Sequence, residues 1–146
     1  MKKIFLFFLL LWSIISFGQC SDCNTLEAAL KAPEKVKTLK FNALQQGVTL
    51  DSLPRSVAKL TNIEVMYISD HDIQTIPKEI GLLVNLKELS FAGCKLTRLP
   101  EEIFQLKNLR ELVLLNNQFS QAYIVEIRAR FKKEMPRTKL LISGVE

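Results

Sequence analysis

Few side chains in this 146-residue sequence are of the kinds that build active sites. The sequence contains one histidine, His71, and three cysteines, Cys20, Cys23 and Cys94. Two neighbouring cysteines without histidines close by fall short of a four-ligand zinc site. The sequence has no glycine-rich phosphate loop, paired-carboxylate signature or cluster of metal ligands. We therefore expect a protein that is not an enzyme and that holds no cofactor or metal.

Apolar runs long enough to cross a membrane are also missing. The stretch from Ile4 to Phe17 has 14 residues and is interrupted by two serines, whereas about 20 apolar residues are needed to span a bilayer. It follows Lys2 and Lys3 and ends at Ser16-Phe17-Gly18, as is typical of a secretory signal peptide cleaved after Gly18. The sequence thus predicts a signal peptide over residues 1–18. The exported chain, residues 19–146, would be secreted, periplasmic or attached to the cell surface.

In an exported protein the Cys20 sulfur could carry either of two covalent modifications. The spacing C-S-D-C allows a disulfide between Cys20 and Cys23, which export would permit. In the alternative, Cys20 is the lipidated first residue of a lipoprotein, although Gln19 is a poor residue before such a site. Lipidation would be the only route to the membrane. A redox role for C-x-x-C would require a thioredoxin-like context, which the sequence lacks.

Positive charge is concentrated only near the C-terminus. Without residues 1–18, which include two lysines, the formal charge falls from +5 to +3. Residues 126–139 are predicted to form a solvated helix face. Nucleic-acid binding would require a larger basic excess and interleaved aromatic residues, so no nucleic-acid partner is expected. The basic side chains of this stretch, against two acidic ones, are Arg128, Arg130, Lys132, Lys133, Arg137 and Lys139.

The dominant feature is an internal repeat of 23 residues that occurs twice between Ile63 and Asn108. Its spacing, L-x-x-L-x-L-x-x-N/C-x-L, resembles that of the leucine-rich repeat family. The second half of each unit, IPKEIGLLVN or LPEEIFQLKN, resembles the repeat type L-P-x-x-I-x-x-L-x-N, a protein-binding scaffold in better-known relatives. The resemblance covers residues 36–120 and implies four repeats. The positions that fit the template are Val36, Leu39 and Phe41, then Leu86, Leu89, Phe91, Cys94 and Leu96, then Leu109, Leu112, Leu114, Asn117 and Phe119.

The resemblance implies an α/β solenoid with a curved parallel sheet on its concave side and short helices or turns on its convex side. Strands are expected near residues 38–41, 65–68, 88–91 and 111–114, with alternate side chains pointing into the core. The convex-side segments should start at Pro54, Pro77 and Pro100, because proline suits a first helical position. The first repeat is four residues longer than the next two, which predicts an inserted loop over residues 42–49.

Helical caps are expected at both ends, because a solenoid exposes its apolar core there. Asn24 or Thr25 can start a helix that Pro33 ends, so residues 19–35 are predicted to form the N-terminal cap. Ser120 can start a longer helix over residues 121–133. The C-terminal cap is therefore predicted over residues 121–146, with residues 140–142 as an extended segment packed against it.

His71 occupies the ninth position of its repeat, where Cys94 and Asn117 stand in the next two. A side chain there satisfies backbone groups that the turn would otherwise bury without partners. We therefore interpret His71 as structural. Its neighbours Ser69, Asp70 and Asp72 complete the residue types of a hydrolase triad. Triad members must converge in space, however, whereas neighbours on one strand point to alternate sides.

Outward-facing positions of successive strands should form columns on the concave sheet. Val65, Tyr67, Val113 and Leu115 are apolar at such positions, where the repeat pattern requires no core residue. Single exposed apolar residues are ordinary, but as a group they favour a contact site for a protein partner. The alternatives are binding of an envelope glycan or anionic polymer, partly through the basic C-terminal cap, or a purely structural role. The predicted contact residues are Val65, Tyr67, Lys87, Ser90, Arg110, Val113 and Leu115.

Overall fold

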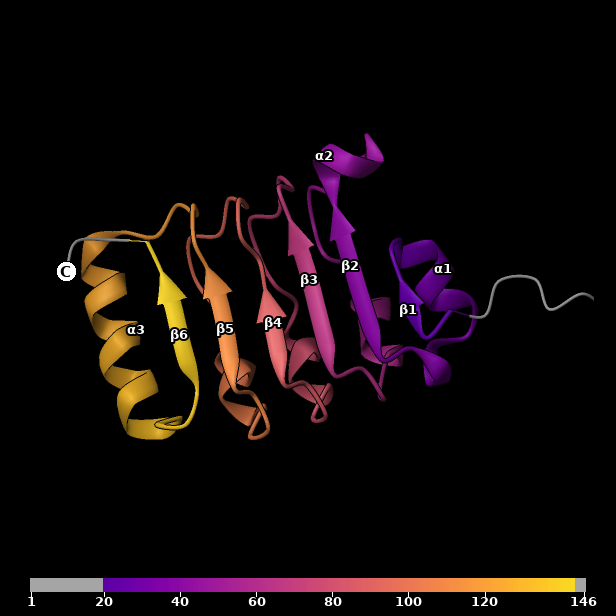
Figure 1. Ribbon diagram of the computed structural model, residues 1–146. Coiled ribbons are helices and arrows are strands. Elements are labelled where there is room, and N and C mark those ends of the chain that lie inside the picture. Colours follow the sequence, from indigo (N-terminus) through magenta and orange to yellow (C-terminus); the bar gives the residue numbers. More distant parts are fainter. Residues whose placement is uncertain (1–19, 144–146) are drawn as a thin grey trace, which may run out of the picture.

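The computed structural model describes residues 20–143 of the chain. A single parallel sheet extends from one end of this part to the other. The predicted signal peptide lies outside these residues. The six strands of the described part lie side by side in sequence order (Figure 1), and each pairs in parallel with the next. They are β1 (Asp22–Cys23), β2 (Thr38–Asn42), β3 (Val65–Ser69), β4 (Glu88–Ser90), β5 (Glu111–Leu114) and β6 (Lys139–Ile142).

The core is built from the template positions, which the repeat spacing places on the inner side of each strand. Leu39, Met66, Leu89 and Leu112 share one register row, and none of them is exposed to solvent. Complete burial of a side chain of this size contributes about 1.5–3 kcal/mol. Because each row is shared by neighbouring repeats, no single repeat could bury its apolar side alone.

Short 3-10 helices cross the convex side, as the repeat pattern predicted. They are η2 (Arg55–Lys59), η3 (Lys78–Leu82) and η4 (Glu101–Gln105). The position predicted for the prolines was wrong by one residue, because Pro54, Pro77 and Pro100 each precede the helix in an extended conformation. The proline carbonyl accepts the first i to i+3 hydrogen bond, from the N–H of Val57 in the first case. The fixed φ of proline suits this capping position as well as the first helical one.

After each of three successive strands, one residue in the left-handed backbone conformation turns the chain. Asp70, Gly93 and Asn116 have φ values of 62°, 68° and 56° and occupy the same position of their repeats. Gly93 is required for a second reason, since a Cβ atom there would collide with the Asp70 carboxylate. The repeated turn therefore fixes where each strand ends and where the next residue, the ninth of the repeat, enters the interior.

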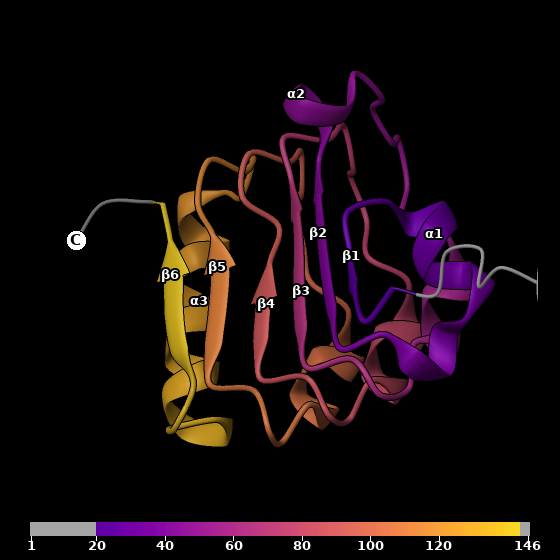
Figure 2. The ribbon, with the colours of Figure 1, turned by 45° about the vertical axis from the view of Figure 1, so that its right-hand side comes forward.

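Both predicted cap helices are present. In α1 (Leu26–Lys31) the Thr25 hydroxyl accepts from the N–H of Ala28 at 3.1 Å, and a short 3-10 helix, η1 (Pro33–Lys35), follows. In α3 (Gln121–Glu134) the Ser120 hydroxyl accepts from the N–H of Tyr123 at 3.3 Å. Figure 1 shows α3 next to β6 at the end of the sheet, and Figure 2 shows it behind β5 and β6, on the convex side, where it buries one face. Its buried residues are Tyr123, Ile124, Ile127 and Phe131.

The sheet extends by one strand beyond the predicted repeats at each end. Before the first repeat, the Ser21 carbonyl accepts from the N–H groups of Lys37 and Thr38 at 2.8 and 2.9 Å, next to β1. After the last, β6 pairs with β5, so residues 139–142 belong to the sheet as well as packing near the cap. Both short strands give hydrogen-bond partners to backbone groups that an uncovered edge would leave open.

The inserted segment is more regular than the predicted loop. It contains a short helix, α2 (Ala43–Gln46), in which the Asn42 side chain accepts from the N–H of Gln45 at 3.0 Å. Gly47 ends the helix in the left-handed conformation, at φ 66°. Figure 1 shows α2 standing beyond the end of β2. Leu44 and Val48 are exposed on this segment.

Cys20 and Cys23 form a disulfide beside β1, with their Cα atoms 5.4 Å apart. Cys94 is buried and free. Over residues 20–143, no helix has both the length and the apolar character that crossing a membrane requires.

Candidate binding surface

The outward face of the sheet carries a row of side chains at the fifth position of each repeat. The strand register aligns Lys40, Tyr67, Ser90, Val113 and Leu141 across five strands. Figures 1 and 2 show α1, α3 and the 3-10 helices away from this face, which is therefore open to a partner. Together with two apolar neighbours this row supplies a surface that we call the concave patch. Its members are Val65, Tyr67, Val113, Leu115 and Leu141.

Tyr67 has a role within the fold that the sequence did not predict. Its hydroxyl donates a hydrogen bond to the Glu88 carboxylate, and the Lys40 ammonium lies 5.7 Å from the centre of its ring. The hydrogen bond to Glu88, together with partial burial, raises the pKa of Tyr67 to about 12. The repeat pattern, which requires no core residue at this position, gave no sign of these contacts. The same contacts hold the ring in place, which lowers the entropy lost when a partner binds.

Ser90 lies in the middle of the row but is buried, with 8% of its surface exposed. The register places its short side chain between the larger Tyr67 and Val113. Its predicted role as an exposed contact therefore does not fit the structure. Val65, Val113 and Leu141 are half-buried, while Leu115 is 39% exposed at the end of β5.

Acidic side chains border the concave patch along the third position of the repeat. Glu88 and Glu111 are register neighbours on β4 and β5. Glu88 accepts the Tyr67 hydrogen bond, and Glu111 lies 3.5 Å from the Lys139 ammonium. Two carboxylates thus lie beside the fifth-position row, in a row that also holds Val65 and Lys139.

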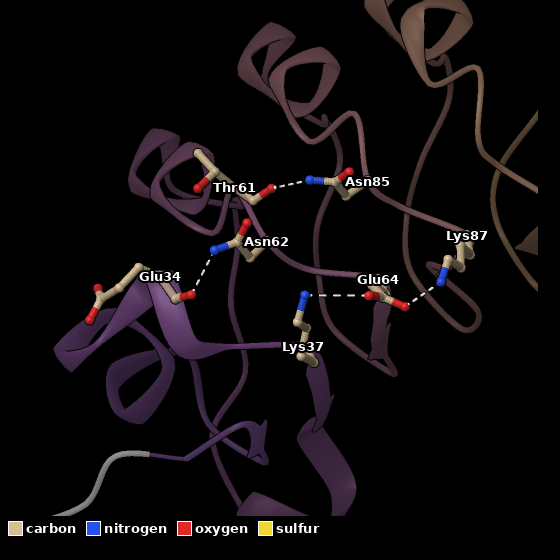
Figure 3. A network of polar contacts seen from close by, with 7 residues as sticks. All are labelled: Glu34, Lys37, Thr61, Asn62, Glu64, Asn85 and Lys87. Atoms are coloured by element: carbon tan, nitrogen blue, oxygen red, sulfur yellow. Dashed lines mark hydrogen bonds and ion pairs between the residues drawn. The ribbon is translucent and has the colours of Figure 1, made fainter.

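The second position of the repeat forms a charged row where the strands begin (Figure 3). Glu64 accepts from both Lys37, at 3.4 Å, and Lys87. These two contacts, that with Lys87 first, lower the pKa of Glu64. Lys87, a predicted contact residue, is therefore already paired. Arg110, the next residue of the row, is exposed and has no carboxylate partner among residues 20–143.

His71 has the structural role that its position in the repeat predicted. It is buried, and its Nδ1 accepts from the N–H of Leu50 at 3.2 Å, just as the Asn117 side-chain oxygen accepts from the N–H of Leu96 at 2.9 Å. Burial lowers the pKa of His71, and contact with the Phe41 carbonyl opposes this effect. No hydrogen bond of ordinary geometry reaches the buried Nε2 atom, so we regard the Phe41 contact as weak. The ring is accordingly neutral and fixed in the interior.

The neighbours of His71 do not assemble into a catalytic group. The Asn42 amide donates to the Ser69 hydroxyl at 2.9 Å and to the Asp70 carboxylate at 2.6 Å. Asp72 instead forms an ion pair with Lys95 at 2.6 Å. The Ser69 hydroxyl and both carboxylates are thus engaged elsewhere, and the Nδ1 atom of His71 serves the backbone of Leu50. Across the part of the chain described by the structure, no three His, Cys, Asp or Glu residues are placed to hold a metal ion.

The sequence comparison agrees with this architecture. Residues 84–123 match a family profile described as leucine-rich repeats in two copies. The chain belongs to the leucine-rich repeat family. No curated protein sequence matches this leucine-rich repeat protein.

Solved structures place the chain among longer leucine-rich repeat proteins. A leucine-rich repeat protein of Leptospira interrogans is 30% identical, with a TM-score of 0.63 over 82% of this chain and 28% of that one. Internalin C2 of Listeria monocytogenes is 20% identical, with a TM-score of 0.57 over 84% of this chain and 50% of that one. A chain in the octameric complex of latrophilin 3, Unc5D and FLRT2 is 17% identical, with a TM-score of 0.50 over 84% and 44%. The chain therefore spans half or less of each of these relatives.

The sequence did not indicate the roles of two residues at the C-terminal end of this leucine-rich repeat protein. Leu141 joins the fifth-position row through β6, and the apolar run in residues 140–142, which was expected to be extended, was the signal that could have placed it there. Tyr123 accepts a hydrogen bond from the buried N–H of Leu99 at 2.9 Å, which connects α3 to the preceding repeat. The pattern of apolar residues in α3 gave no sign of that polar contact.

Proposed function

We propose that the chain is a non-catalytic protein-binding module whose partner docks on the concave patch. The observation that carries this proposal is the row formed by Tyr67, Val113 and Leu141, which lies on a sheet face away from the helices of the fold. These side chains add nothing to the template core, yet they lie in one register row across β3, β5 and β6. Partly exposed apolar side chains that line up on an open face are typical of contact sites.

The chemistry of the patch suits a protein better than a sugar. Tyr67 is its only aromatic side chain, whereas tyrosine is enriched among the residues that dominate protein–protein binding energy. The row of Glu88, Glu111 and Lys139 beside it provides a polar rim. The FLRT2 structure, solved in a complex with latrophilin 3 and Unc5D, supports this use of the fold by analogy.

Export is part of the same proposal. The composition of residues 1–18 supports a signal peptide, and a Cys20–Cys23 disulfide fits an oxidising compartment. A Cys20 sulfur that is bonded to Cys23 is not available for a lipid. We therefore favour a soluble exported chain over a membrane-anchored lipoprotein.

The proposal is tested by capturing partners from the envelope and culture-medium fractions of the source organism. The combined Tyr67→Ala and Val113→Ala substitutions should weaken capture at least tenfold, equivalent to about 1.4 kcal/mol. The matched control combines Leu82→Ala and Val125→Ala, which remove apolar side chains that are 59% and 70% exposed away from the patch. Thermal unfolding of each variant measures the stability that the Tyr67–Glu88 contact contributes, so that a binding loss can be separated from unfolding.

The competing function, contact with an anionic envelope polymer through α3, predicts the opposite pattern. Neutral substitutions at Arg128, Lys132 and Lys133 would then abolish capture, and binding would weaken as salt screens the charges. Loss of capture in that variant with unchanged capture in the Tyr67 and Val113 variant would move the site from the sheet to α3.

A further inference from the structure

The charged row at the start of the strands alternates in sign and then stops alternating. Lys37, Glu64 and Lys87 follow one another as positive, negative and positive, and both lysines pair with the glutamate. Arg110 comes next and adds a second positive charge beside Lys87. The next position of the row is occupied by the uncharged Thr138, so none of residues 20–143 adds a negative group beside Arg110 in this row.

A cleft of about 570 Å³ lies beside Lys87 and Arg110. Lys87 and Arg110 precede β4 and β5, Lys107 follows η4, and Arg137 lies in the turn between α3 and β6. These four basic residues line the cleft with a single carboxylate, Glu64. The cleft therefore forms only where three repeats and the C-terminal cap meet.

The charges in the cleft do not balance. Lys107, Arg110 and Arg137 have no ion-pair partner within the described chain, and Glu64 is already shared by Lys37 and Lys87. Four positive groups and one negative group leave a local excess of three positive charges. Like charges that line one cleft repel one another, so an anion that entered the cleft would relieve the repulsion.

The walls of the cleft are fixed before any ligand arrives. The Asn85 amide donates to the Thr61 carbonyl at 2.9 Å (Figure 3), and the Asn108 amide donates to the Val84 carbonyl at 2.8 Å. These bonds tie each turn to the preceding repeat. Because Lys107 and Arg110 flank Asn108 and Leu109 in one such turn, their backbone positions are set by the repeat stack.

We propose that this cleft binds the phosphate group of a phosphorylated ligand. Two guanidinium groups offer paired donors that match the oxygen atoms of an oxyanion, and two ammonium groups add charge. A single carboxylate would leave most of the positive excess uncompensated, whereas a phosphate or diphosphate carries several negative charges. The volume falls within the range of small-molecule sites, roughly 300–1,000 Å³. The cleft lies where the strands begin, so this site is separate from the concave patch and does not depend on the proposed protein partner.

Titration calorimetry of the full mature chain with inorganic pyrophosphate at low ionic strength tests the proposal. Arg110→Gln combined with Arg137→Gln should weaken binding at least tenfold. Lys132→Gln combined with Lys133→Gln removes the same charge from exposed positions of α3 and should leave binding within about twofold. A variant with Arg110→Lys and Arg137→Lys keeps the positive charge but loses the paired N–H donors of the guanidinium groups, and should bind with intermediate affinity. The Tyr67 and Val113 variant should bind pyrophosphate as the wild type does.

Long-chain polyphosphate and a hexaglutamate peptide serve as the second and third probes. Tighter binding of polyphosphate than of pyrophosphate, lost in the arginine variant, would assign the site to a phosphate-bearing polymer; equal binding would assign it to a small phosphorylated molecule. The proposal is overturned if neither phosphate probe binds, or if both arginine and lysine variants lose binding equally, which would show a diffuse charge effect. It is also overturned if hexaglutamate binds more tightly than both, since the cleft would then take an acidic protein segment.

Discussion

Leu89 is a residue on which the stability of the repeat stack depends. It is fully buried, between Met66 on β3 and Leu112 on β5 in the same register row. Leu89→Ala should lower the free energy of unfolding by about 2–5 kcal/mol, because it removes apolar contacts and leaves a cavity. Leu82→Ala, at a position 59% exposed, is the matched control and should cost far less. Urea denaturation measures both, and equal midpoints for wild type and Leu89→Ala would contradict the strand register.

Lys87→Ala gives a second comparison, at the residue just before the same strand. Its ammonium pairs with Glu64 at a position that remains partly exposed. Partly exposed ion pairs of this kind contribute about 0–1 kcal/mol. The substitution should therefore change the urea midpoint only slightly, and a loss as large as that of Leu89→Ala would show that the charged row is part of the core.

His71 should make the stability depend on pH. Burial keeps its pKa in the folded chain below the ordinary value of 6.5, so the folded state resists the proton that the unfolded state accepts. The stability that the chain keeps while His71 is neutral is fully present above about pH 6.5, and it is lost as the pH falls below that value. Thermal unfolding between pH 8 and pH 5 should show a steeper acid loss for wild type than for His71→Asn, which keeps a hydrogen-bonding side chain without a titrating group. Parallel curves would mean that His71 is not buried in its neutral form.

At the scale of elements, α3 is joined to the repeats by one buried polar contact. The Tyr123 hydroxyl accepts from the N–H of Leu99, and Leu99 is itself buried. Tyr123→Phe leaves this N–H without a partner and should cost about 1–3 kcal/mol. Tyr67→Phe is the matched control, because its hydroxyl bonds to the half-exposed Glu88, which water can then hydrate. Calorimetric unfolding of the two variants should show the larger loss for Tyr123→Phe, and the reverse order would contradict the proposed attachment of the cap.

Elements that repeat were predictable, and elements that occur once were less so. The spacing around Leu39, Leu89 and Leu112 placed β2 to β5 because each strand position is written several times in the sequence. The strand β1 was missed because it has only two residues and forms by pairing with β2. Residues 140–142 were expected to be extended, but their pairing with β5 was missed because they lie outside the repeat pattern. The same distinction applies to single residues. The role of His71 followed from its place in the repeat, whereas the burial of Ser90 depends on the sizes of its neighbours.

The candidate sites show the same division between repeated and unrepeated features. The fifth-position row was visible from Tyr67 and Val113, because the repeat fixes which side chains point outward. The phosphate cleft was not visible, since Lys87, Arg110 and Arg137 come from different turns that meet only in the folded chain. The basic stretch in residues 126–139 instead suggested that an anionic ligand would bind to the C-terminal cap.

For the whole molecule, processing at the N-terminus is the first property to measure. The chain isolated from its source should begin at Gln19, carry no lipid and contain the Cys20–Cys23 disulfide, because the disulfide occupies the sulfur that lipidation needs. Intact mass before and after reduction checks all three features. A diacylglyceryl group on Cys20 would replace the soluble exported chain with a membrane-anchored lipoprotein.

The central claim is that the whole molecule presents one face of its sheet to a protein partner. Site-specific photo-crosslinking tests it most directly, with a photoreactive amino acid placed at position 113 on β5 or, as a control, at position 125 on α3, where Val125 is 70% exposed. Irradiation in envelope and medium fractions should yield a discrete crosslinked protein band from position 113 and none from position 125. A band from position 125 alone would contradict the account, because the partner would then lie against α3 and not against the concave patch.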